Sequence, residues 1–166
     1  MAVDSYRYLA RSMQTMYQGM PAIDEPPVFA PLKKPLRQCR VALLTSAGVY
    51  LKDSQESFDL EGERREPTWG DPSFRVIPSD VRQEQVGVAH LHINSADILE
   101  DLDVVLPIRT FRKLEAEGVI GELAGEHYSF MGYQDRALAG WRETYGPQLV
   151  QRLNERAVDV LLLAPA

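Results

Sequence analysis

Two histidines two positions apart, His90 and His92, have the spacing that most directly suggests chemistry. They lie in "VGVAHLHIN", a mainly apolar stretch that predicts a β-strand over residues 86–94. Alternate residues of a strand point to the same face, so both imidazoles would face one side of the sheet. Paired imidazoles bind Zn²⁺, Cu²⁺ or Fe²⁺ when further ligands complete the site. We therefore predict His90 and His92 as candidate ligands of a divalent metal.

Two histidines alone do not complete a metal site. A third ligand would come from His127, Asp97 or Glu126, or from a thiol that follows residue 166. In the alternative interpretation, the two histidines are polar residues that line a cleft, and one of them is hydrogen-bonded to a carboxylate. Both interpretations remain open on the sequence.

A turn of small residues, Thr45-Ser46-Ala47-Gly48, follows the apolar run of residues 41–44. Small residues let backbone N–H groups approach an anion. Ligands bind outside the carboxyl ends of parallel strands, so Thr45, Ser46 and Gly48 are candidate substrate-binding residues. Ser129, in "HYSFMG", is a fourth candidate. A plain tight turn is the alternative, because the full phosphate-loop and dinucleotide glycine patterns are absent.

The single cysteine, Cys39, can form no disulfide within the chain. Arg37 and Arg40 lie next to it and would favour a thiolate. However, Cys39 precedes the first predicted strand and lies at its amino end, away from the edge where ligands bind. We expect a structural residue at the entry of the strand, because a dithiol reaction needs a second thiol.

Strands and helices alternate along the chain, and this order predicts an α/β fold, a three-layer sandwich with a mainly parallel sheet. Residues 41–44 are apolar throughout and residues 158–163 are apolar except for Asp159, which predicts two central strands buried on both faces. The polar stretch 52–72 is expected to be a loop with a solvated charge run, Glu61 to Glu66. Further strands are expected at 73–78, 103–108 and 127–132, and helices at 96–102, at 109–118 and around Trp141.

The N-terminal part differs from the rest of the chain. A helix is expected from Asp4 or Ser5 to Gly19, with a face rich in Met and Tyr, and residues 21–38 form a proline-rich arm. We predict one unit at 1–38 and an α/β domain at 39–166. Because the N-terminal unit has little core of its own, we expect it to contact another subunit, in a protein that is at least a dimer.

The composition limits the classes of partner. The net charge is −6 and no basic cluster occurs, which argues against binding to nucleic acid. No apolar segment approaches the roughly 20 residues that span a bilayer, and no secretory signal is recognisable. With one cysteine, the expected compartment is the cytoplasm. The expected partner is a small polar substrate.

Several longer stretches carry a resemblance to a known family. They are "SAGVYLKDSQESFD", "GDPSFRVIPSDV", "HLHIN", "DLDVVLPIRTFRKLEAEGVIGELAGEHYSFMGYQ" and "VDVLLLAPA". Over residues 38–166 the chain resembles the glycine/sarcosine/betaine reductase selenoprotein B family, which includes the D-proline reductase subunit. The resemblance is strongest to short, stand-alone members of that family.

The resemblance implies a subunit that takes part in thiol- or metal-assisted reduction of a small polar molecule. In the family, a selenocysteine or cysteine motif follows the last strand at once, and this chain has no residue there. We expect that a tail is missing from this chain, and that the last strand would continue into that motif. The alternative is a non-catalytic binding or assembly subunit that has kept the fold and lost the redox motif.

Overall fold

The computed structural model describes residues 30–66, 69–132, 134 and 138–166. Nearly all of these residues belong to one unit, Leu32–Ala166, and only this unit is considered below. The predicted N-terminal helix and residues 21–29, half of the proline-rich arm, lie outside the described residues. The predicted division at residues 38 and 39 stays a prediction.

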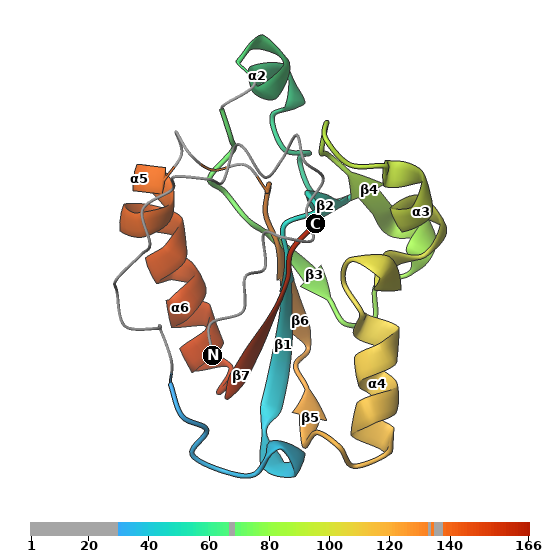
Figure 1. Cartoon of the computed structure of the whole chain (residues 1–166), viewed down its shortest axis with the longest axis vertical. Coiled ribbons are helices and arrows are strands. Elements are labelled where there is room, and N and C mark those ends of the chain that lie inside the picture. Colours follow the sequence, from blue (N-terminus) through green and yellow to red (C-terminus); the bar gives the residue numbers. More distant parts are fainter. Residues whose placement is uncertain (1–29, 67–68, 133, 135–137) are drawn as a thin grey trace, which may run out of the picture. The chain divides into compact units, whose positions relative to one another are not determined.

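Strand β1 (Arg40–Thr45) is the middle of the main sheet. It pairs in parallel with β5 (Glu122–Leu123), β6 (Glu126–Ser129) and β7 (Val160–Ala164). Strand β3 (Arg75–Pro78) runs antiparallel to β6, so the sheet is mixed. Figure 1 shows β1 between β7 on one side and β5 and β6 on the other. The predicted α/β class and the central position of the first strand are confirmed.

Both faces of β1 are covered, because its apolar residues alternate between two cores. Val41 and Leu43 pack in the core that contains residues of α3 (Ser95–Glu100) and α4 (Ile108–Ala116). Ala42 and Leu44 pack in the core that contains Leu149 of α6 (Gly146–Glu155). In Figure 1 these helices accordingly lie on opposite sides of the sheet.

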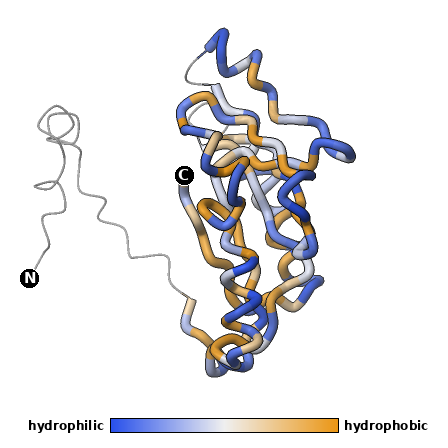
Figure 2. The backbone as a smooth tube through the Cα atoms, turned by 90° about the vertical axis from the view of Figure 1, so that its right-hand side faces the viewer, coloured by the Kyte–Doolittle hydropathy of each residue, from blue (hydrophilic) through white to orange (hydrophobic). Residues whose placement is uncertain are grey.

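A second, two-stranded sheet consists of β2 (Val49–Leu51) and the antiparallel β4 (Val86–Val88). Helix α2 (Leu60–Arg65) lies in the long polar stretch, and Figure 2 shows its end of the molecule as largely hydrophilic. Short helical segments complete the structure: 3-10 turns at Leu36–Gln38, Gln83–Gln85 and Leu102–Val104, α5 (Leu138–Gly140), and a π-helical turn at Trp141–Tyr145 that leads into α6.

Two predicted strands are wrong in part or in whole. The strand expected at 86–94 ends at Val88, and His90 and His92 lie in the bend that follows. Residues 103–108 form no strand. Asp103 instead accepts hydrogen bonds from the backbone N–H groups of Arg109 and Thr110, both at 2.8 Å, which caps α4. An apolar run without alternation does not distinguish a strand from a buried helix entry.

The prediction of a central, fully buried strand at residues 158–163 is also wrong for the described residues. There, β7 pairs with β1 alone and so lies at the edge of the sheet. Leu162 is 38% and Leu163 is 64% exposed, so apolar composition did not guarantee burial on both faces. Among the helices that the structure describes, none is long and apolar enough to cross a membrane.

Candidate functional site

The carboxyl ends of β1 and β7 meet at Ser46 and Ala166. The two strands run in parallel register, with Thr45 opposite Ala164. Beyond the last pair, the Ser46 hydroxyl accepts a hydrogen bond from the backbone N–H of Ala166 at 2.9 Å. This edge of the sheet, where parallel strands end, is the place where α/β proteins bind ligands. We call it the carboxyl edge, formed by Ser46, His90, Gly132 and Ala166.

All three predicted substrate-binding hydroxyls are engaged, and that of Ser46 is bonded only to Ala166, from whose N–H it accepts at 2.9 Å and to whose carbonyl oxygen it donates at 3.4 Å. Thr45 is buried and its Oγ1 accepts from the N–H of Ala47 at 3.3 Å. Ser129 is buried and its Oγ accepts from the N–H of Val49 at 2.7 Å. These bonds hold the turn after β1, which favours the tight-turn alternative for both residues. Substrate binding at this turn stays a prediction, and Ser46 is the residue placed best for it.

Gly48 holds the same turn through its backbone. Its φ is +64°, a conformation that L side chains rarely adopt. Its N–H donates to the carbonyl of Phe130 at 3.0 Å, and its own carbonyl accepts from Ala89 at 2.8 Å. A Cβ at this position would lie 2.1 Å from the carbonyl oxygen of Ala89. Gly48 therefore brings the turn, β6 and the histidine segment together.

His90 and His92 do not share a strand face, because the chain bends between them. The backbone N–H of His92 donates to Nδ1 of His90 at 3.1 Å, and the two rings are perpendicular with centroids 6.1 Å apart. Burial lowers the pKa of His90 below its ordinary value, since desolvation disfavours the imidazolium, while the Glu63 carboxylate opposes this effect. The neutral imidazole is therefore the favoured form of His90.

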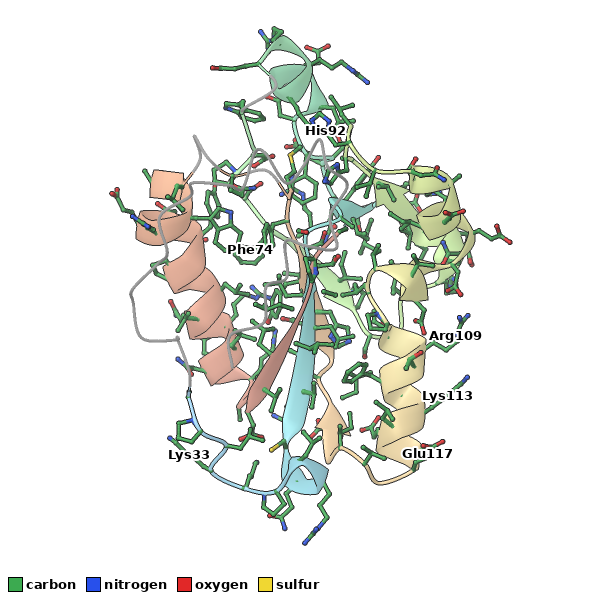
Figure 3. The ribbon with its side chains drawn as sticks, viewed as in Figure 1. Lys33, Phe74, His92, Arg109, Lys113 and Glu117 are labelled. Carbon is green, nitrogen blue, oxygen red and sulfur yellow. The ribbon has the colours of Figure 1, made fainter. Side chains whose placement is uncertain are left out.

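Glu63 is the residue that sequence reasoning missed. It was expected in a solvated loop, but it lies in α2 and is only 2% exposed. Its Oε1 is 3.3 Å from Nε2 of His92, and its buried Oε2 has no hydrogen-bond partner among the described residues. Figure 3 shows His92 on the side of the molecule that carries α2. The sequence contained one sign of this burial. Leu60 and Glu63 are three positions apart, so in a helix the apolar side chain of Leu60 and the carboxylate of Glu63 lie on the same face.

No group of three His, Cys, Asp or Glu residues suited to a metal occurs in the part of the chain that the structure describes. The suggested third ligands are engaged elsewhere. Nδ1 of His127 accepts from the N–H of Leu43 at 3.2 Å, Oδ2 of Asp97 accepts from the side-chain amide of Asn94 at 3.4 Å, and Glu126 pairs with Arg152 and Arg156. Metal binding by His90 and His92 stays a prediction that requires ligands from outside these residues.

Comparison with known proteins decides the family. The family of glycine/sarcosine/betaine reductase selenoprotein B matches residues 7–166. The chain belongs to this family. The resemblance predicted from the sequence is thus confirmed.

Three curated relatives illustrate the similarity. The D-proline reductase subunit gamma of Acetoanaerobium sticklandii is 37% identical over 85% of this chain and 54% of its own length. The glycine reductase complex component B subunit gamma of Symbiobacterium thermophilum is 29% identical over 95% and 35%. The sarcosine reductase complex component B subunit beta of Peptoclostridium acidaminophilum is 26% identical over 87% and 31%. The chain thus spans about a third to a half of the length of these relatives. No solved structure matches the chain.

In this member of the selenoprotein B family, the only thiol is far from the carboxyl edge. Cys39 is fully buried and precedes β1, at the strand's amino end. Its Sγ is 3.4 Å from the carbonyl oxygen of Pro35. The burial agrees with the structural role expected for Cys39. Any thiol chemistry at the carboxyl edge therefore requires a thiol or selenol from outside these 166 residues.

Proposed function

We propose that this chain is a component of a multi-subunit reductase that acts on a small amino acid or its N-methyl derivative. Support comes from the printed names of the relatives, which are subunits of D-proline, glycine and sarcosine reductases. Because the chain spans only part of their length, other residues complete the catalytic unit. The finer fold prediction for this chain, a three-layer sandwich with a mainly parallel sheet, remains part of the proposal.

The observation that carries this proposal is the bond from Ala166 to Ser46. It holds the end of β7 against the turn after β1, with His90 near Gly132 at the same edge. A group brought next to Ala166 would therefore face the Ser46 hydroxyl and the imidazole of His90. Both are polar groups of the kind that orient a small substrate in a cleft.

The reductant has to be a thiol pair or a selenol–thiol pair. Two electrons and two protons leave such a pair when it closes to a disulfide or a selenenyl sulfide, and the substrate takes them up. The chain's own Cys39 is buried at the opposite end of β1, so the pair comes from outside these residues. Thiol chemistry of this kind fits a cytoplasmic location. The chain would also self-associate through residues 1–38, and deletion of residues 1–36 would then lower the mass measured by light scattering.

Purification of the complex from source cells through a tag on this chain tests the proposal. We expect a second component with an alkylatable thiol or selenol pair, identified by peptide mass spectrometry. The purified complex should oxidise a dithiol when D-proline, glycine or sarcosine is added. A chain that purifies without such a component, in a preparation that oxidises no dithiol with any of the three, would contradict the proposal.

A further inference from the structure

Strand β7 forms an edge of the main sheet, and its outer side has no neighbouring strand among the residues that the structure describes. All five residues of β7 pair with β1, from Val160 opposite Val41 to Ala164 opposite Thr45. Alternate backbone N–H and C=O groups of a strand point to opposite sides, so about half of those in β7 face away from β1. These groups can pair with a further strand.

The side chains of β7 are typical of a strand inside a sheet. The strand reads Val-Leu-Leu-Leu-Ala, without a charge or a proline. Leu162 is 38% and Leu163 is 64% exposed, and as neighbours in a strand they lie on opposite faces of the sheet. A strand edge that stays in water is normally protected by charged residues, by proline or by a bulge. β7 has none of these features.

Strand β3, an outer strand on the other side of β1, has the protection that β7 lacks. It contains Arg75 and Pro78. The side-chain amide of Gln55 donates to the carbonyl of Val76 at 2.8 Å, and Nε of Arg75 donates to the carbonyl of Glu56 at 2.8 Å. A loop of the chain itself therefore covers the edge of β3. The difference between the two strands indicates that the edge of β7 is covered from elsewhere.

The relatives indicate what covers it. Their matches leave about half to two thirds of their own length outside the similarity to this chain, and their names are those of subunits of reductases. Under the proposed function, the component that supplies the thiol or selenol pair has to reach Ala166 at the carboxyl edge. A strand that runs parallel to β7 ends at that same edge, because the carboxyl ends of parallel strands meet there.

We infer that the open edge of β7 is the docking surface for the component that carries the thiol or selenol pair: an apolar strand of that component pairs in parallel with β7 and covers Leu162 and Leu163. The identity of the component rests on the proposed function, and the inference goes beyond that function by assigning the interface. The added strand provides hydrogen-bond partners for the outward backbone groups, and its side chains take the two leucines out of water.

Amide hydrogen exchange measures this pairing directly. The full chain is compared alone and in the complex purified through its tag, once the second component has been identified by the mass of its alkylated pair. The outward amides of β7 should exchange at least about tenfold more slowly in the complex, because new hydrogen bonds protect them. The amides of β3 are the internal control and should change by less than about twofold, since that edge is already covered. Amides of β7 that exchange equally fast in both samples would overturn the inference.

Leu163→Lys tests whether apolar contact holds the added strand. Leu163 is largely exposed, so the isolated variant should unfold at nearly the same urea concentration as wild type. Purified from source cells, it should retain at most about a tenth of the second component, because lysine disfavours the pairing of a strand edge. Val104→Lys is the matched control, since Val104 is 62% exposed in a 3-10 turn outside the sheet and should retain the wild-type amount. Equal retention by the two variants would overturn the inference.

The outcomes separate this interface from the proposed function. A complex that oxidises a dithiol with one of the three amino acids, but whose β7 exchanges as in the isolated chain, would overturn the interface and leave the function. A protected β7 in a complex that contains the pair but oxidises no dithiol would support the interface and contradict the function. Protection already present in the isolated chain would mean that its own N-terminal residues or a second copy cover the edge, which would also overturn the inference.

Discussion

The carboxylate of Glu63 lies 3.3 Å from Nε2 of His92, although Glu63 is buried and the side chain of His92 is 56% exposed. The pair connects α2 with the bend that carries both histidines, two segments that are 29 positions apart in the sequence. A buried carboxylate is costly without a polar partner, and the second oxygen of Glu63 already lacks one among the described residues. His92 is therefore expected to stabilise the position of α2.

A double-mutant cycle measures this contribution. His92→Ala should lower the free energy of unfolding by about 1 kcal/mol in the wild-type background, and by much less when Glu63→Gln is already present. Urea denaturation gives both values. Glu61→Gln is the control, because Glu61 is exposed on the same helix and should combine additively with His92→Ala. Additive effects for Glu63→Gln would mean that the two side chains do not interact.

The buried side chain of His127 should make the folded protein less stable in mild acid. It is buried, and burial lowers its pKa to about 4, with Arg112 contributing in the same direction. Between pH 6.5 and pH 4 the unfolded chain therefore binds a proton that the folded chain does not, so stability falls as the pH falls. From pH 7 to pH 5 this group should cost about 2 kcal/mol.

His127→Asn isolates this contribution. Its Oδ1 can accept from the N–H of Leu43 in place of Nδ1, and it does not titrate. Denaturation curves at pH 7 and pH 5 should show a smaller acid-induced loss for the variant, by about 2 kcal/mol. Equal losses in the two proteins would exclude a lowered pKa for His127.

Two glycines with a positive φ allow the cost of backbone strain to be measured apart from the cost of a steric clash. Gly48 and Gly118 have φ angles of +64° and +71°, but only at Gly48 would a Cβ meet another atom within 4 Å. Gly118→Ala should cost about 1 to 2 kcal/mol from the backbone alone. Gly48→Ala should cost about 3 kcal/mol or more, because the clash with Ala89 adds to the strain. Similar losses in urea denaturation would contradict the close approach of Gly48 and Ala89.

The elements that were predicted correctly are those determined by neighbouring residues. The apolar run of β1 and the small residues that follow are contiguous, so local composition was enough to predict a buried strand and a turn at its carboxyl end. The helix expected at 96–102 forms in part, as α3, and the side chain of Asn94 before it accepts from the N–H of Ala96 at 3.1 Å. Both features depend on contacts of short range.

The features that were missed depend on contacts of long range. Strand β4 ends at Val88, and the next N–H, of Ala89, donates to the distant Gly48, after which the chain bends. Glu63 is buried in α2, whose Leu60 packs against a small core that Phe58, Ala89 and Met131 form from three separate segments. The spacing from Leu60 to Glu63 indicated a shared helix face, but the sequence does not show which distant residues cover that face. The exposure of Leu163 likewise depends on how many strands pair with β7.

Substrate-dependent oxidation of a dithiol by the complex purified through this chain tests the reductase assignment most directly. D-Proline, glycine and sarcosine are compared for wild type, Ser46→Ala and Ser54→Ala, the last being an exposed serine that is not among the residues of the carboxyl edge. At least one of the three amino acids should drive oxidation by wild type and Ser54→Ala, and Ser46→Ala should lower kcat/KM by about tenfold or more. Oxidation that no amino acid stimulates, or that Ser46→Ala leaves unchanged, would contradict a substrate site at the end of β1 and β7.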